Sequence, residues 1–197
     1  MKDYMRESEV TYVLDTTALI ARVPLYIRNN CVTTNSVLNE VKDKYSIQGL
    51  ELIDVIGKLK IVNPNEKYIK KILKKAIQLG EINLSKTDIE VAALAYQLKY
   101  GTKNHIVVIT DDYSLQNLIA HLCIEFMPLR TRGIKSKVVY EVFCPNCNWK
   151  LAPKYGKLVS KCPRCGMKLE RRIIKTLNLH EECNEVTRSS MNMGVKS

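Results

Sequence analysis

The amino-acid sequence predicts an α/β/α sandwich with a mainly parallel sheet, followed by a small cysteine-rich module. Apolar segments of strand length alternate with segments of helical period over about the first 127 residues, which is typical of parallel sheets covered by helices. Two paired-cysteine motifs follow. We expect the sandwich at 8–128, a basic connector at 129–142, the cysteine-rich module at 143–175 and a flexible tail at 176–197.

The stretch 11–20 begins as an apolar strand and ends at an acid. Tyr12, Val13 and Leu14 favour a strand that is covered on both faces. Asp15 then stands at the carboxyl end of that strand, at the edge where open α/β sheets bind ligands. An aspartate here is also a good helix cap, so the local sequence leaves both roles open.

A second apolar strand, 105–109, repeats this pattern. Thr110, Asp111 and Asp112 follow it directly, so a hydroxyl group and two acids stand at its carboxyl end. Parallel strands present their carboxyl ends at one edge of the sheet. We therefore expect the two strands to be neighbours and their acids to lie close together.

Two more acids come from predicted helices. Glu40 stands three residues after Val37 on the apolar stripe of its helix, where a carboxylate needs a partner, although such residues also reach solvent. Asp88 fits the reciprocal place of a capping box that begins at Ser85. Asp88 also shares a helical face with apolar residues, so a cap and a ligand role are compatible.

These acids belong to separate elements, and their convergence would be tolerable beside divalent cations. Ligands that are all oxygen atoms fit Mg²⁺ or Mn²⁺ rather than zinc. One or two such ions could activate a water for in-line attack on a phosphodiester. The expected catalytic ligands are Asp15, Glu40, Asp88 and Asp111.

The cysteine-rich module has the spacing of a structural zinc site. Cys144 and Cys147 form one CxxC knuckle, and Cys162 and Cys165 form a second one after fourteen intervening residues. Four thiolates close the coordination shell of a single Zn²⁺, so the expected role is structural rather than catalytic. A redox pair is the competing interpretation, but two knuckles without a thioredoxin-like setting disfavour it.

The composition favours a polyanionic partner. Lys and Arg total 31 against 20 Asp and Glu, so the formal net charge is +11. Nucleic acid fits this charge, and an anionic membrane surface would also attract it. No secretory signal or membrane span is visible, so we expect a cytoplasmic protein without a membrane partner. The expected RNA contacts are Arg130, Arg132, Lys135, Lys137, Trp149, Lys150, Lys154, Tyr155 and Arg164.

The acidic motifs resemble a known family. Leu14-Asp15-Thr16, Glu40, Thr87-Asp88 and Ile109-Thr110-Asp111-Asp112 are similar to the signature acids of PIN-domain nucleases, over residues 10–127. With the zinc ribbon and Gln116-Asn117, the chain resembles the archaeal Nin-one-binding-protein family of endoribonucleases to about residue 175.

The resemblance implies a PIN-like sandwich, a zinc ribbon and metal-dependent hydrolysis of precursor small-subunit rRNA at its mature 3′ end. The substrate would be the single-stranded 3′ region within a pre-small-subunit ribosomal particle that carries assembly factors. Thr16 and Thr110 match hydroxyl positions near the acids, and Asp112 would bind a second metal or cap a helix. The alternatives are a toxin-type PIN ribonuclease acting on tRNA or mRNA, a non-catalytic RNA-binding assembly factor, and a DNA-directed protein.

Overall fold

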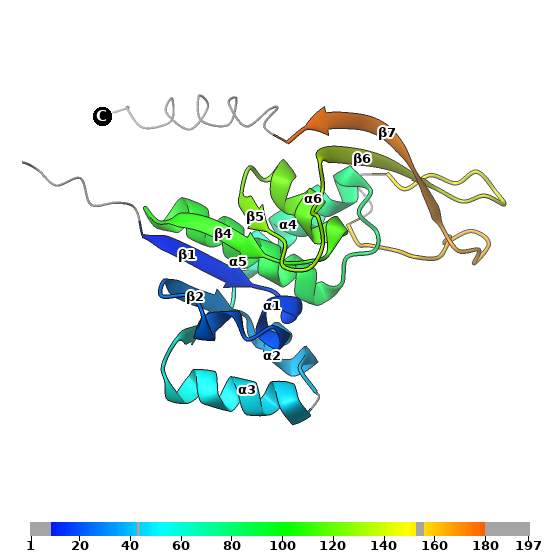
Figure 1. Cartoon of the computed structure of the whole chain (residues 1–197). Coiled ribbons are helices and arrows are strands. Elements are labelled where there is room, and N and C mark those ends of the chain that lie inside the picture. Colours follow the sequence, from blue (N-terminus) through cyan, green and yellow to red (C-terminus); the bar gives the residue numbers. More distant parts are fainter. Residues whose placement is uncertain (1–8, 43, 153–155, 180–197) are drawn as a thin grey trace, which may run out of the picture.

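A five-stranded parallel sheet forms the centre of the molecule (Figure 1). The structure is a computed structural model that describes residues 9–42, 44–152 and 156–179. The strand order is β3-β2-β1-β4-β5, and every neighbouring pair is parallel, which confirms the predicted sheet. The strands are β1 (Val10–Leu14), β2 (Asn30–Thr33), β3 (Leu59–Ile61), β4 (His105–Ile109) and β5 (Glu125–Met127).

Helices flank this sheet. From β1 the chain moves outward through β2 to β3 at one end of the sheet, and it then crosses to β4 and β5 at the other end. Because such crossovers are right-handed, the helices before β3 lie on one face of the sheet and those after β3 lie on the opposite face. Helices α1 and α3 contact each other, and α4, α5 and α6 contact one another. The helices are α1 (Thr16–Ile20), the 3₁₀ turn η1 (Val23–Leu25), α2 (Asn35–Glu40), α3 (Lys44–Val55), α4 (Glu66–Leu79), α5 (Lys86–Gly101) and α6 (Tyr113–His121).

The two strands that are followed by acids, β1 and β4, are neighbours, as the sequence predicts. β1 pairs with β4 in parallel, with Leu14 opposite Ile109. Both of these side chains are fully buried, since the strands lie in the middle of the sheet under helices on both faces. The register brings both strands to the same edge at the same level, so Asp15 and Thr110 come next to each other directly after them.

The polar residue before each of several helices acts as its cap. Ser85 and Asp88 form the predicted capping box of α5, with Asp88 N–H donating to Ser85 Oγ at 3.1 Å and Ser85 N–H to Asp88 Oδ2 at 2.7 Å. Thr34 caps α2, because its hydroxyl accepts from Val37 N–H.

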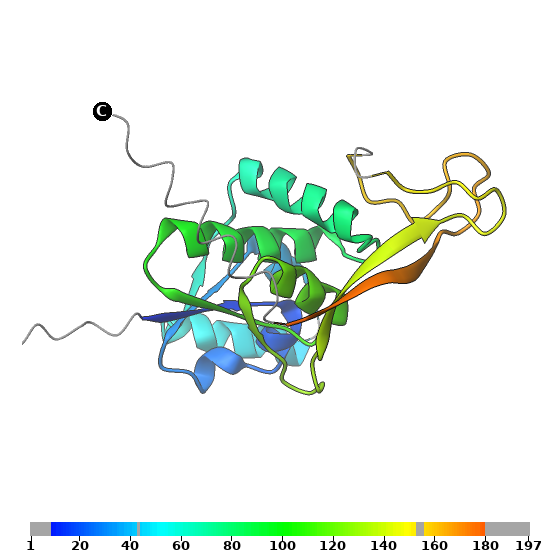
Figure 2. The same cartoon turned by 90° about the horizontal axis from the view of Figure 1, so that it is seen from above.

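A two-stranded antiparallel arm, β6 (Ser136–Phe143) and β7 (Glu170–Asn178), follows the sandwich and extends away from it (Figures 1 and 2). The expected connector, 129–142, thus contains most of β6, and the first residues of the expected tail, 176–178, complete β7. Ser136 pairs with Asn178, and a pairing between such distant residues leaves no local signal in the sequence. Residues 180–197 of the expected tail lie outside the described residues.

Gly80 shows how closely the arm approaches the sandwich. It ends α4 in the left-handed conformation, with φ at 70°, which glycine adopts without strain. A Cβ at this position would lie 2.4 Å from the carbonyl oxygen of Tyr140 in β6. Only glycine therefore allows this contact between α4 and the arm.

Within the described ranges, no helix combines the length and apolar character that a membrane crossing requires.

Candidate active site

We call the carboxyl-end edge of β1 and β4, with the acids predicted to gather there, the acidic edge. Asp15 is its buried acid. Its side chain caps α1, because Oδ1 accepts from Thr16 N–H at 2.6 Å. Its other oxygen, Oδ2, accepts from the hydroxyl groups of Thr110 at 2.8 Å and Thr17 at 3.5 Å. The sequence left the cap and the site roles open, and the geometry combines them, since the capping carboxylate also faces the carboxyl end of β4.

Burial raises the pKa of Asp15 from 3.8 to about 6. The hydrogen bonds from Thr110 and Thr16 oppose this shift, because they stabilise the ionised form. The negative charges of Asp88 and Asp112 add to the increase. Asp15 is thus within the electrostatic range of two other acids.

Glu40 lies at the carboxyl end of α2, where its exposed side chain meets α1. Thr16 Oγ1 donates to Glu40 Oε2 at 2.6 Å, so this hydroxyl is the partner of the carboxylate. Asp88 lies at the first turn of α5, and burial is the main cause that raises its pKa. The charges of Asp112 and Glu40 raise the pKa of Asp88 further. Glu40 therefore belongs to the same electrostatic group as Asp88.

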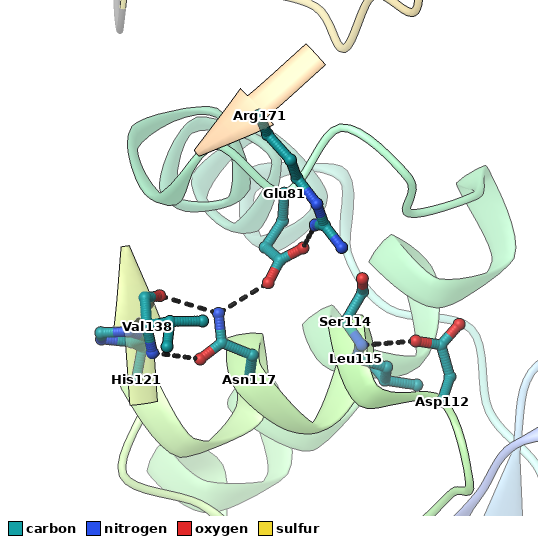
Figure 3. Close-up of polar contacts among 8 residues, drawn as sticks. All are labelled: Glu81, Asp112, Ser114, Leu115, Asn117, His121, Val138 and Arg171. Carbon is teal, nitrogen blue, oxygen red and sulfur yellow. Dashed lines mark hydrogen bonds and ion pairs between the residues drawn. The ribbon is translucent and has the colours of Figure 1, made fainter. Parts of the chain in front are cut away.

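The adjacent acids Asp111 and Asp112 have different surroundings. Asp112 caps α6, with Oδ1 accepting from Ser114 N–H at 2.6 Å and Leu115 N–H at 3.1 Å (Figure 3). Its charge acts on both Asp15 and Asp88. Asp111 instead turns to the segment after β5, where Arg130 and its neighbours donate backbone hydrogen bonds to it.

Slight burial opposes ionisation of Asp111, but the hydrogen bonds outweigh it, so the pKa of Asp111 is lowered. The charges that raise the pKa values of the buried acids are thus those of Asp88 and Asp112 at Asp15, and those of Asp112 and Glu40 at Asp88. The expectation placed Asp111 with Asp15, Glu40 and Asp88 and left Asp112 ambiguous.

The chemistry of this edge fits a divalent cation. Its donors are carboxylate and hydroxyl oxygens, which suit Mg²⁺ or Mn²⁺, and the raised pKa values of Asp15 and Asp88 show that positive charge would be stabilising there. In the described part of the chain, the carboxylates of this edge do not gather into a group of three ligand atoms as closely as the cysteines do.

The four cysteines of the ribbon come together as predicted. Their Sγ atoms all lie within 4.8 Å of one another, with Cys144 and Cys165 3.4 Å apart and Cys147 and Cys162 3.5 Å apart. Four thiolates at about 2.3 Å around one Zn²⁺ would be about 3.8 Å apart. The cluster therefore fits a closed tetrahedral zinc site.

Comparison with known proteins identifies the family. Residues 12–98 match the model of the PIN domain of ribonuclease. The chain is 38% identical over 137 residues to a protein named Endoribonuclease Nob1 from Pyrococcus abyssi, which covers 68% of this chain and 78% of that protein. The chain belongs to the Nob1 family of PIN-domain endoribonucleases. It is thus an RNA-cleaving hydrolase, as the motifs predict.

Two other relatives bear on the substrate of this Nob1-family chain. Ribonuclease VapC1 from Thermoplasma acidophilum is 31% identical over 162 residues, which is 81% of this chain and 77% of that protein. The 20S-pre-rRNA D-site endonuclease NOB1 from Saccharomyces cerevisiae is 32% identical over 108 residues. That match covers 51% of this chain and 24% of the yeast protein.

Several of the expected RNA contacts lie on the surface of this Nob1-family chain. Arg130, Arg132 and Lys135, in the segment between β5 and β6, are exposed, and so is Arg164 in the second knuckle. Lys150 is also exposed, but its ammonium group pairs with Glu141 at 2.6 Å. Lys154 and Tyr155 lie outside the described residues.

Two of these candidates are placed differently from the expectation. Lys137 is only 1% exposed, because its position in β6 turns the side chain inward, so it does not contribute to an RNA-binding surface. Trp149 is half-buried and packs against the apolar cluster around Val142 and Leu169. Strand alternation decides the inward direction of Lys137 in β6, whereas Trp149 lies outside the strands, beside the first cysteine knuckle.

Sequence reasoning missed a buried polar cluster beside this site. Glu81 follows α4 and is 1% exposed; it accepts from Asn117 Nδ2 at 2.6 Å and from Arg171 Nη1 at 2.5 Å (Figure 3). The hydroxyl of Ser114, in the first turn of α6, also hydrogen-bonds Glu81. A lone glutamate after a helix cap carries no signal of burial, since its partners come from distant segments.

Proposed function

We propose that this Nob1-family endoribonuclease cuts precursor small-subunit rRNA to generate its mature 3′ end. The catalytic part rests on the buried Asp15 at the carboxyl end of β1, which Thr110 after β4 contacts and Thr16 links to Glu40. The charges of Asp88 and Asp112 raise the pKa of Asp15, so these four acids form the candidate group. The rRNA substrate is supported by the name of the yeast relative, a 20S-pre-rRNA D-site endonuclease.

These four acids would hold one or two Mg²⁺ or Mn²⁺ ions. Asp112 replaces Asp111 in this proposed set because one oxygen of Asp111 is occupied by the backbone N–H groups of 129–131. The charge of Asp112 also raises the pKa values of Asp15 and Asp88. A bound cation supplies an activated water and stabilises the leaving oxygen. Thr110 and Thr16 orient the carboxylates of Asp15 and Glu40 through hydrogen bonds of 2.8 and 2.6 Å. They keep the acids in place before substrate arrives.

The ribbon and the basic segments would hold the RNA. One structural Zn²⁺ would join the four cysteines, and the exposed cations Arg130, Arg132, Lys135 and Arg164 would bind phosphates of a single-stranded 3′ region. The natural substrate would be a pre-small-subunit ribosomal particle with its assembly factors, in the cytoplasm.

The direct test is Mn²⁺-dependent cleavage of an RNA that spans the mature 3′ end of small-subunit rRNA and its downstream extension. The wild type should make a single cut at the mature end. Asp15→Asn and Asp112→Asn should bind the RNA but lose the cut. Asp54→Asn, at an exposed acid of α3, is the matched control and should cut normally. Cleavage retained in both site variants would refute the assignment of the acids.

A toxin-type ribonuclease acting on tRNA or mRNA is the second candidate. It is favoured by the similarity to Ribonuclease VapC1, which extends over 162 residues. The same enzyme preparation should be given tRNA, mRNA and the rRNA fragment at equal concentrations and salt. A specific cut in tRNA or mRNA with no cut in rRNA would support the toxin-type function instead.

A non-catalytic assembly factor would behave differently in the same cleavage assay. It would bind the rRNA fragment tightly and cut nothing under Mn²⁺ or Mg²⁺, even when pre-small-subunit particles are added. DNA oligonucleotides of the same sequence separate a DNA-directed function, because the rRNA proposal requires RNA to bind more tightly at matched salt.

A further inference from the structure

One carboxylate oxygen of Asp111 holds the segment that follows β5 through hydrogen bonds. Its Oδ1 accepts the backbone N–H groups of Leu129 at 2.9 Å, Arg130 at 2.9 Å and Thr131 at 3.1 Å. The Thr131 hydroxyl adds a fourth hydrogen bond at 3.3 Å. Three successive peptide groups thus point at the same anion, so the backbone conformation of 129–131 depends on this side chain.

Gln116 binds the other end of the same segment through a hydrogen bond. Its Oε1 accepts from Ile134 N–H at 3.0 Å, and its Nε2 donates to the carbonyl of Thr110 at 2.9 Å. The Gln116 side chain is fully buried, so this anchor is rigid. We call residues 129–134 the basic loop. Asp111 and Gln116 together hold its two ends against the carboxyl end of β4.

The basic loop presents two cations close to the acidic edge. Arg130 and Arg132 are exposed, and neither forms an ion pair with another residue in the described ranges. The anchor itself adjoins the acids: Asp111 N–H donates to Thr17 Oγ1 at 3.4 Å, and that hydroxyl donates to Asp15 at 3.5 Å. Two hydrogen bonds therefore connect the anchor to the buried acid.

We propose that Asp111 is a positioning residue, which holds the basic loop so that Arg130 binds an RNA backbone phosphate beside the scissile bond, and that it does not ligate the metal. This inference rests on the proposed function. Arg130 would pair with a phosphate through two N–H groups, and a loop already held in place loses little entropy when it does so. Asp112 remains the metal ligand of the pair.

Asparagine and alanine at position 111 separate the two roles. Asn keeps an oxygen acceptor for the three peptide groups but places an amide where a cation would need the second oxygen. Ala removes the acceptor entirely. A positioning residue should tolerate Asn and fail as Ala, whereas a metal ligand should fail as both.

The experiment measures kcat and KM for Mn²⁺-dependent cleavage, together with Mn²⁺ affinity and RNA affinity in the absence of turnover. We expect Asp111→Asn to keep kcat and Mn²⁺ affinity within about threefold of wild type, and Asp111→Ala to raise KM and the RNA Kd about tenfold with kcat retained. Asp112→Asn is the matched neighbour and should lose Mn²⁺ binding and kcat together.

A double-mutant cycle shows whether Asp111 acts through Arg130. Arg130→Ala should weaken RNA binding about as much as Asp111→Ala, and the double variant should be no worse than Arg130→Ala, because both changes remove the same contact. Additive losses would contradict the proposal. Thermal unfolding of each variant separates these effects from loss of the fold.

Loss of Mn²⁺ binding in Asp111→Asn, comparable to that in Asp112→Asn, would overturn the inference and make Asp111 a ligand. Unchanged RNA affinity in Asp111→Ala would also overturn it, because the basic loop would then not need its anchor. Failure of the proposed function looks different: wild type would not cut the rRNA fragment at all. The two affinity measurements need no cleavage, so they still decide the role of Asp111.

Discussion

The carboxylate of Glu81 and the guanidinium of Arg171 form an ion pair, Oε2 to Nη1 at 2.5 Å, that joins the sandwich to β7 (Figure 3). The Glu81 side chain is 1% exposed and that of Arg171 is 25% exposed. Asn117 extends the contact to β6, because it exchanges two hydrogen bonds of 2.9 Å with the backbone of Val138. One buried cluster thus fixes both strands of the arm relative to α6, whose N-cap residue is Asp112.

Glu81→Ala should destabilise the protein by about 3 to 5 kcal/mol, because it removes the acceptor of the Arg171 charge and one of the two acceptors of the Asn117 amide. Urea unfolding measures this loss. Glu81→Gln keeps an acceptor for Asn117 and should cost less. A cost below about 1 kcal/mol for the alanine variant would mean that the cluster contributes little to stability.

Asp15 should make stability depend on pH. Its pKa rises from 3.8 to about 6 on folding, so the folded protein binds this proton more tightly than the unfolded chain does. The resulting stabilisation is fully present below pH 3.8 and is lost as pH rises through about 6. Above that pH, the ionised buried carboxylate costs on the order of 3 kcal/mol.

Asp15→Asn removes this titration and keeps a capping oxygen. It should be more stable than wild type at about pH 7.5, and the difference should disappear near pH 4. The measurement is urea unfolding in buffers without Mg²⁺, Mn²⁺ or chelator, so that zinc stays bound. A variant that is less stable than wild type at neutral pH would show that the ionised Asp15 carboxylate does not destabilise the folded protein.

Zinc removal should unfold the ribbon and leave the sandwich folded. The ribbon buries only a small apolar cluster around Val142, Cys144, Cys162 and Leu169, so the metal has to supply most of its stability. Cys144→Ser should lose the single zinc and increase hydrogen exchange over 143–170. Exchange in β1 and β4 should not change. Cys31→Ala, at a buried cysteine of β2, is the control and should retain zinc.

Thr16→Val should weaken metal binding through Glu40. The substitution keeps the backbone N–H that donates to Asp15 but removes the hydroxyl that donates to Glu40 at 2.6 Å. Groups that orient metal ligands typically contribute about 10- to 100-fold to affinity or activity, and we expect a loss of that size in Mn²⁺ affinity. Thr16→Ser retains the hydroxyl and should restore binding. Equal affinity in both variants would contradict a role for this contact.

Local signals were enough for the regular elements and for the positions of the acids at their ends. The apolar strands before Asp15 and Thr110, the capping box at Ser85 and the spacing of the four cysteines all depend on residues that are close in sequence. Parallel strands then bring their carboxyl ends to one edge, so the meeting of β1 and β4 could be predicted as well.

The remaining features depend on contacts between distant segments. Lys137 is buried at its place in β6, a strand that forms by pairing with the distant β7, and Glu81 is buried where Asn117 and Arg171 reach it from elsewhere in the chain. The sequence by itself determined that two acids follow β4. Only the tertiary structure decided that Asp111 binds the backbone of the basic loop while Asp112 caps α6 and adds its charge to the surroundings of Asp15, because the partners of the two acids come from different elements.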